Sequence, residues 1–140
     1  MNVLAKQVRM RSNCPVSYAL DFFGDKWTLL IIRDLALEQK RFYKDFQGSK
    51  EGIATNILSD RLKKLENVGI VRSAVYEQKK TQKEYFLTQK GKDLIPILLE
   101  MMVWSFKYNN ELNVTEEFIQ KIKTNRAEVI KYFLSQLDGE

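Results

Sequence analysis

The feature that most constrains the fold is a helical pattern that changes to a strand pattern at Gly69. Before this glycine, residues 54–67 carry leucines that fall within a narrow arc of a helix, namely Leu58, Leu62 and Leu65. After it, apolar and polar side chains alternate in residues 71–76 and 84–88, on both sides of the cationic loop 77–83. Helical spacing followed by alternation predicts a helix that ends at Gly69 and then a β-hairpin.

A short helix is predicted just before this unit. Residues 42–46 form about one and a half turns, and Gly48 and Gly52 bracket the turn that follows. Two helices joined by a tight, glycine-containing turn make a helix-turn-helix, and a cationic hairpin after them makes it winged. The predicted fold class is therefore mainly α with a small β-hairpin, a winged helix-turn-helix.

Two helices are predicted ahead of this unit. Pro15 at the first helical position and Gly24 just past the end delimit residues 15–23. Asp25 is suited to cap a second helix over residues 26–37, whose apolar stripe is wide.

Two more helices are predicted after the hairpin. Thr88 can cap a helix that runs to about residue 108, and Pro96 should break it near residue 95. A last amphipathic helix is predicted over residues 115–136. The aromatic and methionine side chains are expected to be mostly core, with an effector cavity as the alternative, and they include Trp27, Phe42, Phe46, Met101, Met102 and Trp104.

The inventory of reactive side chains argues against an enzyme. The chain has no histidine and one cysteine, so it can build neither a Ser-His-Asp nor a Cys-His catalytic arrangement, and no Cys/His zinc site. We expect no catalytic residue, no cofactor and no metal. The N-terminus lacks the pattern of a signal peptide, and the longest uncharged apolar stretch, residues 27–32, is far too short to span a membrane. A single cysteine fits a reducing cytoplasm.

Charge is concentrated in the middle of the chain. Residues 40–92 hold 13 basic and 6 acidic side chains, whereas residues 1–39 have a net charge of +1 and residues 93–140 a net charge of −3. A basic segment that coincides with the helix-turn-helix and its wing indicates binding to a polyanion, here double-stranded DNA. An ordinary lysine-rich surface is the alternative.

The arc of residues 54–67 opposite the leucines is the predicted DNA-reading face. Asn56 is suited to paired hydrogen bonds with adenine, Ser59 to hydrogen bonds with donor or acceptor groups, and Lys63 to hydrogen bonds with guanine or phosphate. Asp60 could orient Lys63 or accept a hydrogen bond from the amino group of cytosine. The candidate recognition residues are Thr55, Asn56, Ser59, Asp60, Arg61 and Lys63, and the candidate phosphate-binding residues of the wing are Lys79, Lys80 and Lys83. A solvated helix face without a function is the alternative for the first set.

Several short motifs follow one another along residues 14–108. They are Cys14-Pro15, Ala19-Leu20-Asp21, Gly24-x-Lys26-Trp27, Arg41-Phe42, Gly52-Ile53-Ala54, Leu58-Ser59-x-Arg61-Leu62-x-x-Leu65-Glu66-x-x-Gly69 and Glu84-Tyr85-x-Leu87-Thr88-x-x-Gly91. Together they resemble the HxlR family of winged helix-turn-helix regulators. The resemblance implies a bacterial or archaeal transcription factor that binds DNA as a homodimer. The wing departs from the family pattern because it lacks prolines and has Gln82 where an arginine is common.

The predicted organisation is an N-terminal arm over residues 1–13, the winged domain over 14–108 and a helical extension over 109–140. We expect the homodimer to form through the N- and C-terminal helices and to repress transcription from a pseudo-palindromic operator. A winged-helix module that binds proteins without specific DNA binding is the alternative.

Cys14 is a candidate redox or electrophile sensor. It precedes Pro15 at a predicted helix N-terminus, and Arg9, Arg11 and Lys26 are expected nearby, surroundings that favour the reactive thiolate. Some family members resemble this arrangement and use that cysteine to sense oxidants or electrophiles. Because the chain has no second cysteine, a disulfide must link two protomers or recruit a small thiol. The alternative is a quiet, partly buried cysteine that packs against residues 26–37. A small-molecule effector is a further possible partner.

Overall fold

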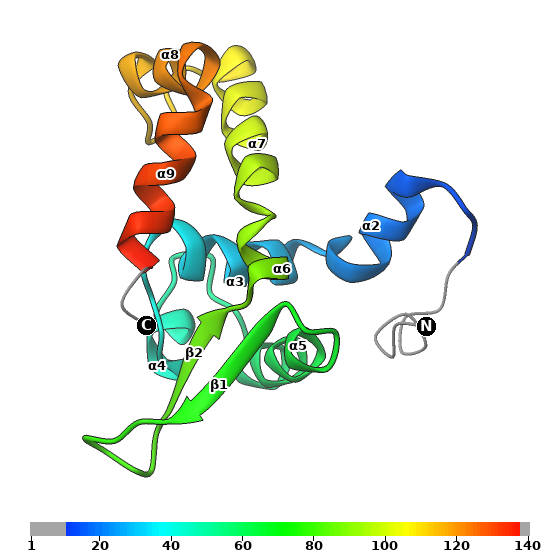
Figure 1. The fold of residues 1–140 in the computed structure, drawn as a ribbon, viewed down its shortest axis with the longest axis vertical. Coiled ribbons are helices and arrows are strands. Elements are labelled where there is room, and N and C mark those ends of the chain that lie inside the picture. Colours follow the sequence, from blue (N-terminus) through cyan, green and yellow to red (C-terminus); the bar gives the residue numbers. More distant parts are fainter. Residues whose placement is uncertain (1–10, 138–140) are drawn as a thin grey trace. The chain divides into compact units, whose positions relative to one another are not determined.

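The computed structural model describes residues 11–137, which divide into two compact units on either side of the Gly91–Lys92 bond (Figure 1). Residues 1–10 of the predicted N-terminal arm and the last three residues of the predicted extension lie outside the described residues. The first unit contains α2 (Pro15–Phe23), α3 (Lys26–Leu37), α4 (Tyr43–Gln47), α5 (Thr55–Asn67), β1 (Val71–Val75) and β2 (Lys83–Leu87). α6 (Gln89–Lys92) spans the boundary, and the second unit continues with α7 (Ile95–Tyr108), α8 (Glu116–Thr124) and α9 (Arg126–Leu137).

The first two helices begin and end where the sequence predicts. Pro15 opens α2, and the N–H of Gly24 closes it by donating to the Leu20 carbonyl at 2.8 Å. Asp25 caps α3, because its carboxylate accepts from the Thr28 N–H at 3.1 Å and from the Thr28 hydroxyl at 2.6 Å. Local capping chemistry therefore fixes both boundaries.

The predicted helix-turn-helix is confirmed. α4 begins one residue later than predicted, and α5 buries all three of its patterned leucines, Leu58, Leu62 and Leu65. α5 ends in a Schellman motif: Gly69 has a φ of 78°, and the Ile70 N–H donates to the Leu65 carbonyl at 3.0 Å. A left-handed residue is needed at this place, which explains the glycine.

β1 and β2 form the predicted antiparallel hairpin, which projects from the helices as the wing (Figure 1). Val71 pairs with Leu87 at its base and Val75 with Lys83 toward its tip. One feature was not predicted: an isolated bridge joins Phe42 to Glu84, so the segment before α4 adds a further pairing to β2. This bridge ties the wing to the helix-turn-helix.

The C-terminal helices follow the sequence prediction in one place and depart from it in another. The helix predicted from Thr88 is broken before Pro96 into α6 and α7, as expected. The single helix predicted over residues 115–136 is wrong, because Asn125 leaves the helical region with a φ of −145° and divides it into α8 and α9. The break lets α9 turn back so that the rings of Phe118 and Phe133 lie 6.3 Å apart, which a continuous helix would prevent.

The expectation that the aromatic and methionine side chains are mostly core also needs correction. Phe46 is buried, but Met101 is 46% and Trp104 66% exposed. They belong to a row of exposed apolar side chains on α7, which we call the α7 stripe: Ile97, Met101, Trp104 and Tyr108. Spacings of four, three and four residues place these side chains on one face of the helix. The sequence pattern had predicted two of these four, Met101 and Trp104, to be core.

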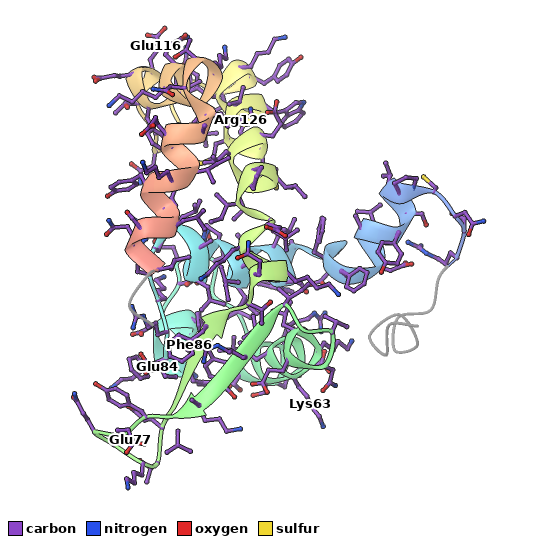
Figure 2. The ribbon with its side chains drawn as sticks, in the orientation of Figure 1. Lys63, Glu77, Glu84, Phe86, Glu116 and Arg126 are labelled. Atoms are coloured by element: carbon purple, nitrogen blue, oxygen red, sulfur yellow. The ribbon has the colours of Figure 1, made fainter. Side chains whose placement is uncertain are left out.

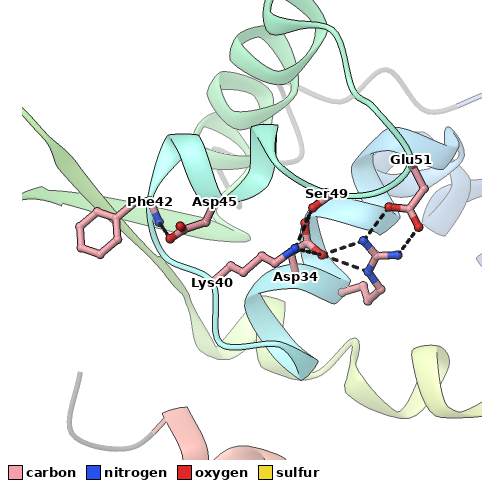
Figure 3. A network of polar contacts seen from close by, with 7 residues as sticks. Asp34, Lys40, Phe42, Asp45, Ser49 and Glu51 are labelled. Atoms are coloured by element: carbon pink, nitrogen blue, oxygen red, sulfur yellow. Dashed lines mark hydrogen bonds and ion pairs between the residues drawn. The ribbon is translucent and has the colours of Figure 1, made fainter. Parts of the chain in front are cut away.

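A buried carboxylate holds the turn of the helix-turn-helix against α3 (Figure 3). Asp34 is 2% exposed and accepts from Arg33 at 2.7 and 3.0 Å and from the Ser49 hydroxyl at 2.5 Å. Lys40 lies 3.6 Å from the same carboxylate and donates to Ser49 at 2.9 Å. Both oxygens of the buried charge are thereby satisfied, as burial of a charge requires.

The same arginine extends the network to the far side of the turn. Arg33 donates two hydrogen bonds to Glu51, at 2.7 and 3.0 Å. These bonds raise the pKa of Arg33 and lower the pKa of the Glu51 carboxyl to about 2. Residues 49 and 51, just before α5, are therefore both fastened to the end of α3.

Replacing Asp34 by asparagine should destabilise the first unit by about 3 kcal/mol, because the neutral amide leaves the positive charges of Arg33 and Lys40 without their buried anion. The measurement is urea unfolding followed by Trp27 fluorescence in a Trp104→Phe background, where Trp27 is the only remaining tryptophan. Glu38→Gln is the control, since Glu38 is exposed and near Asp34 in the chain. Equal midpoints for the two variants would contradict the role given to Asp34.

Candidate nucleic-acid interface

The solvent-facing side of α5 carries the predicted recognition residues. Thr55, Asn56, Ser59, Asp60 and Lys63 are all exposed, while the leucine face is buried. Figure 2 shows Lys63 pointing away from the body of the first unit. Among the described residues, neither Asn56 nor Lys63 has a side-chain hydrogen bond or ion pair, so both are available to another molecule.

A tyrosine of α4 holds the start of this face. The Tyr43 hydroxyl lies 3.0 Å from the Thr55 carbonyl oxygen and 3.0 Å from the Ser59 hydroxyl oxygen. Tyr43 was not among the residues that the sequence indicated for the interface. The pattern contains no signal for this contact, because the tyrosine and the serine are 16 residues apart and on different helices.

Arg61 and Asp60 are engaged within the protein. The Arg61 guanidinium donates to Asp25 at 3.1 Å and to Asp60 at 2.5 Å, and the bond to Asp25 raises the pKa of Arg61. Asp60 also pairs with Lys64 at 3.3 Å, whereas the partner expected from the sequence was Lys63. Arg61 thus joins α5 to the N-cap of α3, and Lys63 stays unpaired within the described chain.

The wing presents its lysines at an exposed tip. The turn is closed by backbone hydrogen bonds, from the Tyr76 N–H to the Gln82 carbonyl and from the Gln82 N–H to the Lys79 carbonyl, both at 2.9 Å. Lys79, Lys80 and Lys83 are all exposed, and within residues 11–137 the only ion pair that they make is a 4.0 Å contact from Lys80 to Glu77. Figure 2 shows Glu77 at this tip.

The start of the wing's turn is fixed against the N-cap of the short helix α4. The ring of Tyr76 meets that of Phe42 edge to face, with centroids 4.8 Å apart. Between the wing and α4 lies a hollow of about 460 Å³ lined by Phe42, Tyr43, Lys44, Thr81, Gln82, Lys83 and Tyr85. The hollow brings the cations Lys44 and Lys83 to one place, and Lys44 had not been singled out from the sequence.

Cys14 is the N-cap residue of α2 and is exposed, so the alternative of a partly buried cysteine packed against α3 does not hold. Of the basic residues expected nearby, Arg9 lies outside the described residues. Arg11 pairs with Asp21 at 3.0 Å, and the Lys26 ammonium lies over the Trp27 ring at 4.9 Å. The thiol is therefore open to reagents, while the two described cations are engaged elsewhere.

Residues 11–137 contain neither a candidate metal site nor a membrane-spanning helix. No group of three or more His, Cys, Asp or Glu side chains there could hold a metal ion, and no helix there is long and apolar enough to cross a membrane. The second unit has a hollow of about 550 Å³ between α8 and α9, lined by Phe118, Lys121, Asn125, Glu128, Val129 and Tyr132.

Known proteins resemble this chain in sequence and in structure. The family profile described as HxlR-like helix-turn-helix matches residues 22–113. The uncharacterized HTH-type transcriptional regulator YdeP of Bacillus subtilis (strain 168) is 34% identical over 103 residues, 74% of this chain and 80% of YdeP.

Two solved structures share the fold. The putative transcription factor PA1607 is 36% identical with a TM-score of 0.66, over 76% of this chain and 72% of that one. The redox regulator HypR in its oxidized form is 35% identical with a TM-score of 0.58, over 69% of this chain and 97% of that one. With its winged helix-turn-helix and exposed α5 face, the chain belongs to the HxlR-like helix-turn-helix family of DNA-binding transcriptional regulators.

Proposed function

We propose that this protein is a homodimeric repressor that reads a pseudo-palindromic operator with α5 and contacts the flanking phosphates with its wing. The observation that carries the proposal is that one scaffold carries two exposed surfaces: the polar face of α5, on which Asn56 and Lys63 are unpaired, and the lysine-bearing hairpin tip. An α-helix fits the major groove, and lysines beside it can reach the backbone. Bound at a promoter, such a dimer represses by blocking polymerase.

Each candidate residue receives a role from its surroundings. Asn56 and Lys63 are free to bind base edges, and Thr55 lies in the first turn of α5, the end that enters the groove. Lys79, Lys80 and Lys83 neutralise phosphates, which adds affinity with little sequence information. In our proposal Arg61 fixes the orientation of α5 through its bond to Asp25, and Asp60 holds the Arg61 guanidinium in place.

The organisation proposed from the sequence has an arm over residues 1–13, a winged domain over 14–108 and an extension over 109–140. The family match over residues 22–113 supports the middle segment. Binding to chromosomal DNA implies a cytoplasmic location. A small-molecule effector would have the α8–α9 hollow as its site, where Lys121 and Glu128 offer opposite charges.

Selection from random duplex DNA should enrich a pseudo-palindrome whose half-sites lie about 10 base pairs apart or a multiple of that, because a two-fold dimer presents two copies of α5 to successive grooves. Affinity for the selected duplex should fall steeply with salt. Replacing Lys79, Lys80 and Lys83 by glutamine should flatten the slope of log affinity against log salt by about 5, because each of the two wings of the dimer loses three phosphate contacts. Fluorescence anisotropy over a salt series measures both.

The control carries the same loss of charge in the second unit, through Lys121→Gln, Lys123→Gln and Lys131→Gln, all at exposed positions. It should leave the slope unchanged. The rival, a winged-helix module that binds proteins, predicts no enriched motif and no effect of the wing lysines. Our proposal is refuted if the wild-type protein enriches no motif, or if the wing variant keeps the salt slope of the wild type.

The exposed apolar faces of two helices support a homodimer. The α7 stripe carries no charge, and α2 exposes Val16 and Leu20 while burying none of its residues. Contiguous apolar surface of this kind on a small protein marks an interface. Spacing of four and three along α7 is that of helices that pack against each other.

A Met101→Glu, Trp104→Glu double variant should be monomeric, because association would bury carboxylates in an apolar contact. Sedimentation equilibrium should give twice 16.5 kDa for the wild type and 16.5 kDa for the variant. Lys123→Glu on α8 is the control for added negative charge and should remain a dimer. A double variant that stays dimeric would place the interface elsewhere.

Control by oxidants or electrophiles through Cys14 is the second part of the proposal. It is supported by the exposed thiol at the N-terminus of α2 and by the likeness to HypR, a redox regulator. Oxidation by peroxide forms a sulfenic acid, which then condenses with a small thiol or with Cys14 of a second protomer. Either product adds bulk beside the apolar face of α2.

Treatment with hydrogen peroxide and glutathione should release the wild-type protein from its selected operator, and Cys14→Ser should stay bound. Anisotropy measures release, and intact mass spectrometry reports modification of Cys14 in the same samples. Ser12→Ala is the control, since the Ser12 hydroxyl accepts from the Cys14 N–H at 3.2 Å but carries no thiol. Full operator binding by a completely modified wild-type protein would exclude sensing.

A further inference from the structure

The contact between Tyr43 and the recognition helix α5 determines which oxygen the hydroxyl hydrogens of Tyr43 and Ser59 point to. Two short oxygen–oxygen distances meet at the Tyr43 hydroxyl, 3.0 Å to the Thr55 carbonyl and 3.0 Å to the Ser59 hydroxyl. Both are hydrogen-bonding distances, so each needs a hydrogen between its two oxygens. The three groups together carry only two such hydrogens, one on the tyrosine and one on the serine.

Only one arrangement satisfies both contacts. A carbonyl oxygen has no hydrogen to give, so Tyr43 must donate its hydrogen to Thr55. The contact between Tyr43 and Ser59 then takes its hydrogen from the serine. Ser59 therefore donates inward to the tyrosine oxygen, and what its hydroxyl oxygen offers to solvent is lone pairs alone.

We propose that Tyr43 sets the base preference of α5 by making Ser59 a hydrogen-bond acceptor only. This inference rests on the proposed function, in which α5 reads the major groove. The partner of Ser59 is then an exocyclic amino group, the N6 of adenine or the N4 of cytosine. The sequence alone left Ser59 free to donate or to accept, and the tyrosine removes the first choice.

The groups that Ser59 rejects follow from the same chemistry. Guanine O6 and N7, thymine O4 and phosphate oxygens are all acceptors, and they cannot bond to a serine whose hydrogen is committed. Asn56, one turn earlier, keeps both donor and acceptor, and Lys63, one turn later, has donors only. One face of α5 thus presents three different hydrogen-bonding patterns in order along the groove.

Tyr43 is a positioning residue in this scheme, since it touches Ser59 and not the base. A purely structural tyrosine would also join α4 to α5, but its loss would weaken binding to every sequence alike. A change of preference at one base pair, with the others unaffected, is the readout that separates the two roles.

The test uses full-length wild type, Tyr43→Phe, Ser59→Ala and the control Tyr76→Phe. The control removes a tyrosine hydroxyl whose bond, to Gln78 at 2.9 Å, lies within the wing. Selection from random duplexes with wild type and Ser59→Ala identifies the base pair whose preference depends on Ser59. Affinities are then measured for all four base pairs at that position. Thermal unfolding confirms that each variant is folded.

We expect the wild-type protein to prefer a base with an amino group at the contacted position, by about tenfold over a base with an acceptor there. In Tyr43→Phe the serine hydroxyl is free to rotate, so this preference should fall to about twofold. Tyr76→Phe should keep the full tenfold.

A second measurement does not depend on Tyr43→Phe being folded. The preferred adenine or cytosine is replaced by purine or 2-pyrimidinone, which lack the amino group. The wild type should then lose about tenfold in affinity, whereas Ser59→Ala should lose nothing further relative to its own affinity for the natural duplex. The serine variant thereby corrects for any change in the DNA itself.

The inference is overturned by any of three results: Tyr43→Phe keeps the wild-type preference, Ser59→Ala alters preference at no position, or the preferred base presents an acceptor. In each of these cases an enriched pseudo-palindrome would still stand, and the proposed function with it. If the wild-type protein enriches no motif, the proposed function fails, and the inference is refuted with it.

Discussion

The buried carboxylate of Asp34 is the constraint on which the placement of the recognition helix α5 depends. Its two oxygens hold Arg33 and Ser49, and through Arg33 the network reaches Glu51, so the turn that leads into α5 is fastened to α3 at two points. A turn of this length has few apolar side chains of its own and gains its shape from these polar contacts. Because a buried charge tolerates little displacement of its partners, the start of α5 is held in one direction.

Further contacts fix α5 on its other sides. Arg61 bonds to Asp25, the cap of α3, and Tyr43 bonds to the first turn and to Ser59. The leucine face supplies the apolar burial, but leucines alone would allow the helix to shift along its axis. Polar contacts from two neighbouring helices remove that freedom. Asn56 and Lys63 can then stay unpaired, which is the condition for recognition of another molecule.

The sequence predicted the helix boundaries that residues close together in the chain determine. The bounds of α2 and α3, the end of α5 at Gly69 and the break before Pro96 all come from caps, prolines and glycines. The break at Asn125 was missed because the apolar positions keep a helical period across it. The bridge from Phe42 to Glu84 and the contact of Tyr43 with Ser59 were missed because they join residues distant in the chain.

Periodicity also cannot say what covers an apolar face. The α7 stripe has the spacing of a core helix, yet its side chains are exposed in the monomer. In the proposed dimer a second copy covers this face, and periodicity alone does not tell whether an apolar face packs within one chain or against another. α2 likewise has an apolar face that is exposed in the monomer, with Val16 and Leu20 on it. Cys14 lies at the N-terminus of this helix. In the proposed dimer, chemistry at this thiol would act on a dimerising helix, and a change there would alter the spacing of the two α5 helices without touching either one.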